Sequence, residues 1–378
     1  MAKNLKQNNS DIIMLKFGQV SPDIKISTPS WEEGTVRNEN SYVPFGPSNR
    51  FPNELYAIIQ QSPTASSIIS GTVELIKRYS INENYNLPCY PYINNKHDSI
   101  ESLVENLVTD YMMFGMISIQ VIWNKLGEIA ELHHIPVEMI RLNEDKTKVW
   151  FNKKWKTYST VSTVYPVFTG STDDGYSQVY VYTNTGNRQT YGKSMFAPAI
   201  NDITAEAIAS QYIKNSLESG LASRYVIDLP NSANLPDEQK EAIEKGIKDK
   251  FCGVENAGTF MIYFNNTAEK LNVTKVDTDD SHEVFNSIRL AAKNNIFVSA
   301  HATPNLFGDP TSTTGFNSQE YDEAFKLYDK MTIKPALKVI TNAFNTIFNL
   351  DNAIEFTEVN DTNENEAKAD NNKNNVEE

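Results

Sequence analysis

Two stretches of helical periodicity in the second half of the chain enclose a short run of strand and helix patterns. Residues 199–219 place apolar side chains along one side of a helix, and Gly220 is a common helix stop. A second helix is predicted from about residue 281 to 294. Between them, a helix pattern at 236–251 stands among strand patterns at 225–229, 259–264 and 271–276. This order predicts an α+β chain that contains a small α/β segment.

The rest of the chain also mixes helices with short strands. Residues 53–78 are predicted to be helical with a break at Pro63, and residues 98–114 form a second helix pattern. The last helix pattern, at 317–348, contains Pro335 deep inside it, so a kink is expected there. Strand patterns occur at 117–123, 128–134, 137–142, 149–158 and 178–183.

Length and charge limit the class of protein. The 378 residues suggest two or three domains, and 34 Lys and Arg against 48 Asp and Glu give a net charge of −14. Because clustered cations supply sequence-independent affinity for nucleic acid, this acidity argues against a surface that grips phosphate backbones. Cys89 and Cys252 stand far apart, which excludes a disulfide framework or zinc ribbon and suits a reducing cytoplasm.

Membrane and export signals are not expected. The most apolar stretch, residues 111–123, falls short of the roughly 20 residues that span a bilayer. The N-terminus lacks the apolar core of a signal peptide.

Both ends are predicted to be tails. Residues 1–42 have little periodicity and form an arm that is expected to be partly disordered. Residues 349–378 are predicted to be a disordered acidic tail, because beyond Asn360 the chain is almost free of large apolar residues.

Two polar clusters contain residue types that could form a chemical site. Residues 277–282, with Asp277, Asp279, Asp280 and His282, offer ligands for a metal ion, but their spacing does not fit an EF-hand. The same acids can cap and start the following helix. His133 and His134 are adjacent in a strand pattern and point to opposite faces, so they are not expected to share a metal.

A basic and aromatic stretch at 146–158 admits two interpretations. Alternating rings and lysines can stack bases and pair phosphates. A hairpin with Trp150 and Trp155 packed inward and its lysines outward explains the same residues, and we favour it.

The loop at 301–316 is the most unusual segment. It contains no Lys or Arg, a single acid, Asp309, and a run of hydroxyl side chains. Loops of this length in compact proteins are often functional.

Several weak motifs follow one another in a characteristic order between residues 43 and 347. They comprise YMMFG at 111–115 with 119–123, residues 127–132 with 135–137, YGKS at 191–194 with Pro198, residues 212–220, 225–229 and 235–239, residues 294–309 with ATPNLFGD, and residues 319–320 with 333–337. In this order they resemble the portal proteins of tailed bacteriophages. Ala302 and Thr303 depart from the family pattern, which has an apolar pair before the proline.

The resemblance implies an α+β portal fold with a minimal crown. Its parts would be a wing at 43–195, stem helices at 199–220 and 281–298, a clip at 221–278, a tunnel loop at 301–317 and a kinked wing helix at 318–348. It also implies a ring, usually of twelve subunits, at one capsid vertex, through which double-stranded DNA passes during packaging and ejection. No catalytic residue, metal or cofactor is implied.

The resemblance further implies partners and site residues. The clip would dock the terminase large subunit and later the tail adaptor, and the ring would also meet the major capsid or scaffold protein. The chain would reside in the virion, and in the host cytoplasm during assembly, with no membrane partner. Candidate docking residues are Glu238, Lys240, Glu241, Lys245 and Lys248. Candidate channel residues are Asn305, Phe307, Asp309, Thr311, Ser312, Thr313 and Thr314.

Two alternatives remain open. Another ring-forming head–tail connector would belong to the same structural class, but such chains are usually shorter and lack paired stem helices. A metal-dependent phosphoesterase or nuclease would use the acids and histidine at 277–282.

The loop at 301–316, which has no Lys or Arg, offers no phosphate contacts that must break at each step of DNA movement, and this favours a passage for sliding DNA.

Overall fold

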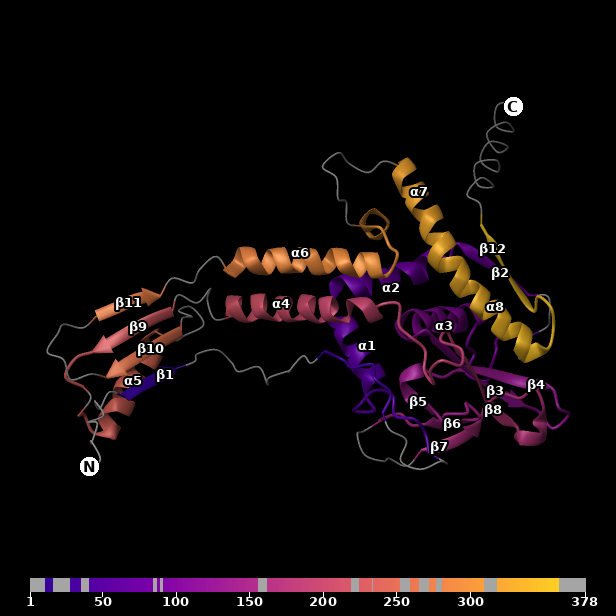
Figure 1. Cartoon of the computed structure of the whole chain (residues 1–378), viewed down its shortest axis with the longest axis horizontal. Helices are drawn as coiled ribbons and strands as arrows, with labels where there is room; N and C mark the ends of the chain where they lie inside the picture. The colour runs from indigo at the N-terminus through magenta and orange to yellow at the C-terminus, as the bar shows by residue number, and fades with distance from the viewer. Residues whose placement is uncertain are drawn as a thin grey trace, which may run out of the picture. The chain divides into compact units, whose positions relative to one another are not determined.

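The chain divides into two units, seen here in a computed structural model (Figure 1). Unit 1 comprises residues 1–27 and 205–291, and unit 2 comprises residues 28–204 and 292–378. Among the described residues, no helix combines the length and apolar character needed to cross a bilayer. The structure describes residues 11–15, 28–34, 41–83, 87–88, 91–155, 162–218, 224–232, 234–251, 259–264, 272–276, 281–308 and 318–359.

In its described residues, unit 1 contains a four-stranded sheet, one complete helix and parts of two long helices. The strand order is β1 (Asp11–Leu15), β10 (Thr259–Phe264), β9 (Arg224–Leu229) and β11 (Asn272–Val276). β9 and β10 are parallel, so they need a crossover, and α5 (Asp237–Phe251) supplies it. These elements confirm the predicted strand and helix patterns. The pairing of β1 with β10 was not predicted.

Two helices begin in one unit and end in the other. α4 (Ile200–Glu218) and α6 (Ser281–Ser299) match the two predicted long helices, and the unit boundaries fall within them. In unit 2, Asn295 of α6 donates to a carboxylate oxygen of Asp202 in α4 at 2.9 Å. Ile203 and Ile296 are fully buried in the same unit.

Unit 2 begins with three helices, α1 (Phe51–Gln61), α2 (Pro63–Ile76) and α3 (Ile100–Phe114). The predicted break at Pro63 is confirmed. Ser62 caps α2 by accepting a hydrogen bond from the Ala65 N–H at 3.1 Å, and a proline is well suited to the first helical turn. α3 ends at Gly115, whose φ of 64° is the left-handed conformation that glycine adopts readily.

Two small sheets follow α3. One has the order β4 (Ile129–His134), β3 (Met116–Trp123), β8 (Ser177–Thr183), and the other β5 (Ile140–Leu142), β6 (Lys148–Phe151), β7 (Thr163–Pro166). The strand predicted over 137–142 is wrong in its first half. Residues Val137–Met139 form a 3-10 turn closed by a hydrogen bond from the Met139 N–H to the Pro136 carbonyl at 2.9 Å, so only 140–142 remain extended.

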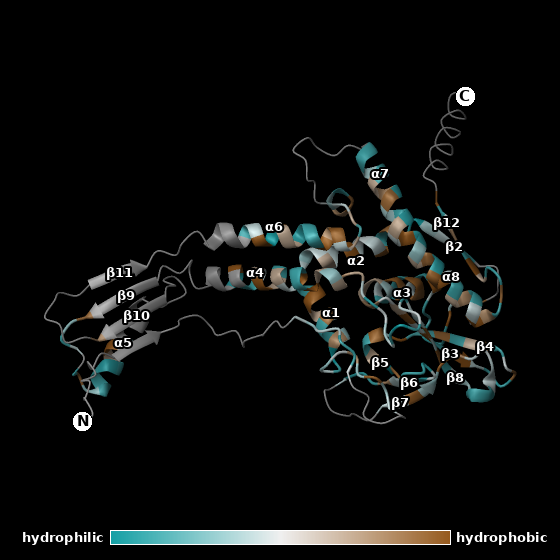
Figure 2. Ribbon diagram, in the orientation of Figure 1, coloured by the Kyte–Doolittle hydropathy of each residue, from teal (hydrophilic) through white to brown (hydrophobic). Residues whose placement is uncertain are grey.

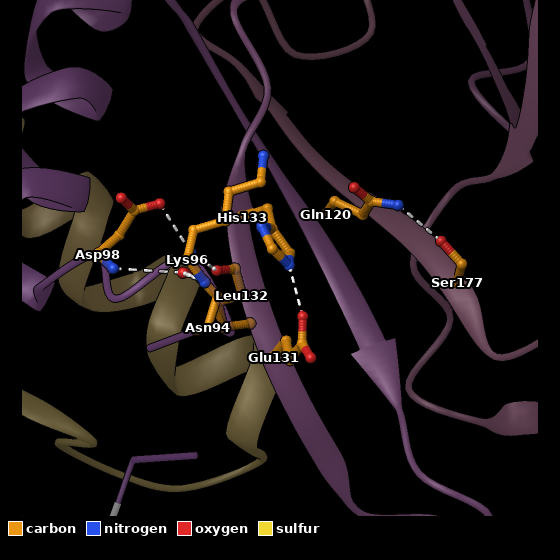
Figure 3. Close-up of polar contacts among 8 residues, drawn as sticks. All are labelled: Asn94, Lys96, Asp98, Gln120, Glu131, Leu132, His133 and Ser177. Carbon is orange, nitrogen blue, oxygen red and sulfur yellow. Dashed lines mark hydrogen bonds and ion pairs between the residues drawn. The ribbon is translucent and has the colours of Figure 1, made fainter. Parts of the chain in front are cut away.

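The two adjacent histidines of β4 have different hydrogen-bond partners. His133 Nε2 lies 2.7 Å from a carboxylate oxygen of Glu131 (Figure 3). His134 Nε2 lies 2.8 Å from Asp110 of α3. Asp110 also accepts a hydrogen bond from the Val137 N–H, while burial raises the pKa of its carboxyl group.

Side-chain amides tie loops to the sheet of β3. Gln120 donates to the Ser177 hydroxyl at 2.8 Å, which links β3 with β8 (Figure 3). Asn94 donates to Asp98 at 2.9 Å and to the Leu132 carbonyl at 3.0 Å. The loop before α3 is therefore held against β4.

A buried arginine fastens residues 43–50 to the sheet of β5. Arg141 is fully buried and donates to both the side-chain and main-chain oxygens of Asn49, each at 2.7 Å. Its guanidinium lies 4.7 Å from the Trp155 ring centroid. Burial lowers the pKa of Arg141 to about 10. Trp150 and Trp155 are buried while Lys148, Lys153 and Lys154 are exposed, which confirms the inward-aromatic interpretation for these residues.

Part of the N-terminal arm also belongs to unit 2. Glu33 accepts hydrogen bonds from the Thr190 N–H at 2.7 Å and the Tyr191 N–H at 3.2 Å. Trp31 donates from its indole N–H to the Gly192 carbonyl at 3.3 Å. Residues 28–34 are thus attached to the segment that leads into α4.

A long helical stretch near the C-terminus is interrupted by one wider turn. α7 (Ser318–Tyr328) is followed by the π turn η5 (Asp329–Ile333) and by α8 (Lys334–Phe348). The kink expected at Pro335 stays a prediction, but the π turn ends two residues before this proline, which has no N–H and whose ring crowds the preceding turn. α8 is amphipathic (Figure 2) and packs against α3, β8 and β12 (Ile354–Glu358).

The tail predicted from residue 349 is wrong for residues 349–359. α8 ends at Asn349 with a left-handed φ of 53°, and β12 then pairs antiparallel with β2 (Tyr79–Glu83). Ala353 and Ile354 are buried, so this segment covers apolar surface that a polar tail leaves open. Residues 360–378 lie outside the described residues.

Candidate functional site

The base of the 301–317 loop is built on the end of α6. The Ala302 N–H donates to the Phe297 carbonyl at 2.9 Å, and Ala300 and Ala302 are buried. A short 3-10 helix, η4 (Pro304–Phe307), follows and ends at Gly308 with a φ of 79°. The first part of the loop is therefore a defined turn.

Phe307 anchors this turn in an aromatic cluster. Its ring meets the Tyr328 ring edge-on with centroids 5.3 Å apart, and the Phe297 centroid lies 6.3 Å away. On α2, a Cβ added to Gly71 would lie 2.7 Å from the Phe307 ring, so the ring sits directly on the helix backbone. Only a glycine leaves room for this close approach.

Polar contacts hold the π turn next to the same cluster. The hydroxyl groups of Tyr328 and Thr72 lie 2.7 Å apart. Tyr79 donates to a carboxylate oxygen of buried Asp329 at 2.5 Å, and Lys334 Nζ lies 2.8 Å from the other oxygen. The loop base, α2, β2 and the long helix thus form one connected structure within unit 2.

Two tyrosines of this structure are held in the neutral form. Burial raises the pKa of Tyr328 to about 12. Burial, with the hydrogen bond to Asp329, also raises the pKa of Tyr79. Both tyrosines are therefore neutral near pH 7, and their hydroxyl groups take part in the hydrogen bonds that hold the loop base and the π turn.

The structure describes two of the candidate channel residues. Asn305 and Phe307 lie in η4 and are half-buried. The other five, at 309 and 311–314, lie outside the described residues: Asp309, Thr311, Ser312, Thr313 and Thr314. Contact of this loop with DNA remains a prediction.

The candidate docking residues lie on α5 of unit 1. Glu238, Glu241 and Lys245 are exposed. Lys240 is only 7% exposed, and its Nζ lies 5.8 Å from the Phe264 ring centroid. Lys240 therefore faces the sheet, which corrects the expectation that it lies on a docking surface. The side chain of Lys248 lies outside the described part of α5.

The residues that the structure describes do not form a candidate metal site. Within them, no three His, Cys, Asp or Glu side chains come together as a metal site. Asp277, Asp279 and Asp280 lie outside the described residues, as does the side chain of His282. The metal-site alternative rests on sequence alone.

Sequence reasoning missed the contacts that support the loop. Gly71 lies in a helix pattern in which its small size has no local explanation, and Asp329 is a buried acid within an amphipathic helix. A glycine and an acid within predicted helices are the sequence signals that could have indicated these contacts.

Similarity to known proteins agrees with this fold. The neck of an empty gene transfer agent (GTA) particle, computed with C6 symmetry, superposes with a TM-score of 0.54 at 16% identity, covering 82% of this chain and 85% of that chain. A chain from the virion of a native GTA particle superposes with a TM-score of 0.53 at 15% sequence identity, covering 85% of this chain and 89% of that chain. An HK97 family phage portal protein from Corynebacterium diphtheriae superposes with a TM-score of 0.50 at 12% sequence identity, covering 81% of this chain and 94% of that chain. No curated protein sequence matches the chain.

The α+β architecture, a mixture of helices and short strands, is thus that of phage portal structures. The sequence model of the family described as Phage portal protein matches residues 64–370. The chain belongs to the phage portal protein family.

Proposed function

We propose that this chain forms a ring of about twelve copies at one capsid vertex and that double-stranded DNA passes through the ring during packaging and ejection. The family match over residues 64–370 carries the proposal, because it includes residues 205–291 of unit 1, both long helices and the 301–317 loop. GTA neck structures computed with C6 and C12 symmetry support a cyclic assembly. The ring belongs to the virion and is assembled in the host cytoplasm against the major capsid or scaffold protein.

The oligomeric state tests this proposal directly. Native mass spectrometry and negative-stain electron microscopy of the purified chain are expected to show closed rings with a central opening. A monomer that cleaves DNA only with a divalent metal would contradict the proposal and favour the phosphoesterase alternative.

Helix α5 is the proposed docking surface for the terminase large subunit and, after packaging, for the tail adaptor. Its exposed side chains Glu238, Glu241 and Lys245 support this role, together with Lys248 from the sequence pattern. The double variant Glu238→Lys/Glu241→Lys is expected to form rings but to lose terminase binding in a pull-down. Glu144→Lys/Asp145→Lys makes the same charge change on an exposed turn of unit 2 and serves as the matched control. Normal binding by the α5 variant would contradict the assignment.

The 301–317 loop is the proposed contact with moving DNA. Its residues Asn305, Asp309 and 311–314 offer polar groups without a cation, so they release phosphates easily. Phe307 acts as the anchor of the loop, through its contacts with Phe297 and Tyr328.

Lysine substitutions test the loop. Thr311→Lys, Ser312→Lys and Thr313→Lys are made separately, and at least one is expected to slow packaging or ejection because a cation would hold the phosphates. Unchanged rates in all three variants with intact rings would contradict this role of the loop.

A further inference from the structure

The long helix of unit 2 carries a row of exposed lysines in an otherwise acidic chain. Lysines recur at every fourth position through α7, η5 and α8, and each is exposed: Lys326, Lys330, Lys334 and Lys338. Lys334 also pairs with buried Asp329, which fixes one member of the row.

The π turn keeps this row in line. In a regular α-helix a residue four positions on is rotated by about 40°, so a row at this spacing drifts around the helix. A π turn has i→i+5 hydrogen bonds and therefore rotates by a smaller angle per residue than an α-helix. This smaller rotation offsets the drift in the middle of the row. Burial supports this, because Tyr328, Thr332, Ala336 and Ile340 share the four-residue spacing and are all buried.

An apolar row lies beside the lysines on the exposed side. Leu327 is 52% exposed and Met331 46% exposed, and Pro335 continues the same spacing. Solvated helix faces seldom gather large apolar side chains in one row, whereas protein interfaces combine an apolar centre with a charged rim. A phosphate backbone would use the lysines but not Leu327 and Met331.

The same helix begins with the opposite charge. Glu320, Asp322 and Glu323 are exposed in the first turns of α7. One helix therefore presents an acidic surface followed by a basic one. A cyclic ring joins two different surfaces of each copy head to tail, so complementary charges on one element meet this requirement.

We infer that the long helix joins neighbouring copies of this chain: the lysine row of one copy lies against the acidic first turns of α7 in the next, with Leu327 and Met331 at the centre of the contact. This inference rests on the proposed ring and names the surface that closes it.

Charge exchange between two variants provides the test. The basic-face variant is Lys326→Glu/Lys330→Glu, and the acidic-face variant is Glu320→Lys/Glu323→Lys. Each alone places like charges at every junction, so each is expected to lose rings in native mass spectrometry at physiological salt. When they are mixed in equal amounts, every junction in an alternating ring is complementary, and rings are expected to return. Lys153→Glu/Lys154→Glu makes the same charge change on an exposed turn and is expected to form rings normally.

The outcomes separate the inference from the function it rests on. Return of rings on mixing also shows that both variants are folded. Rings in each variant alone would overturn the inference, as would a mixture that stays without rings while circular dichroism shows folded chains. A basic-face variant that forms rings but loses retention of double-stranded DNA on a filter would assign the lysines to DNA instead. A wild-type chain without rings would overturn the proposed function itself.

Discussion

Replacing Tyr79 by phenylalanine tests the support beneath the loop. The substitution removes one hydroxyl group and leaves the ring, which is 8% exposed, in place. The hydroxyl donates at 2.5 Å to Asp329, a carboxylate that is only 4% exposed. A hydrogen bond to a charged, buried group contributes about 1.5–3 kcal/mol, so we expect Tyr79→Phe to lower the free energy of unfolding by about 2 kcal/mol.

Urea unfolding followed by tryptophan fluorescence measures this change in unit 2 alone. All four tryptophans, Trp31, Trp123, Trp150 and Trp155, lie in that unit together with Tyr79. Tyr176→Phe is the matched control, because its ring is 56% exposed and the expected change is below about 0.5 kcal/mol. A double-mutant cycle with Asp329→Asn isolates the coupling between the two groups.

The pH dependence gives an independent check with a defined sign. Because the pKa of Tyr79 is raised in the folded protein, its contribution is complete below about pH 10, the ordinary tyrosine value, and is lost as pH rises above it. The difference between wild type and Tyr79→Phe is therefore expected to shrink above pH 10. A difference below about 0.5 kcal/mol at pH 7, or one that grows above pH 10, would refute the reasoning.

Two further substitutions test other parts of unit 2 by the same unfolding measurement. Arg141→Met is expected to cost about 3 kcal/mol, because it leaves the buried oxygens of Asn49 without their donors; a loss below about 1 kcal/mol would contradict the buried network. Gly115→Ala is expected to cost more than about 2 kcal/mol, since its φ is 64° and the new Cβ would lie 2.3 Å from the Lys193 carbonyl oxygen. The exposed Gly127→Ala, with φ 80° and nothing within 4 Å, separates the cost of the backbone conformation from that of the clash.

Local sequence patterns located the elements that repeat a simple period. The helices α3, α5 and α8 and the strands β3, β9 and β10 occur where their apolar spacing predicts them. Short strands with distant partners were beyond such patterns. β12 pairs with β2, which lies far earlier in the sequence, so no short stretch of sequence contains both strands. The same is true of β1 and β10.

The position of the candidate loop in the sequence was predictable, but the contacts that hold its base were not. The loop could be located because strong helix patterns lie on both sides of it. That Phe307 is an anchor depends on Gly71 and Tyr328, which are distant in sequence. The inward orientation of Lys240 likewise depends on Phe264, because α5 alternates charges on all but a narrow side.

Residues 205–291 of unit 1 lie between the two parts of unit 2 in the sequence, so the second part of unit 2 is synthesised well after the first. α3 is complete at Phe114, but α8, which packs against it, begins at Lys334. A ribosome adding about 5–20 residues per second needs roughly 10 to 40 s to make the intervening chain. Throughout that time α3, whose Leu103 and Leu107 are fully buried in the finished protein, has no α8 to pack against. The yield of this protein in a cell is therefore expected to depend on what protects the first half of unit 2 while the second half is still being translated.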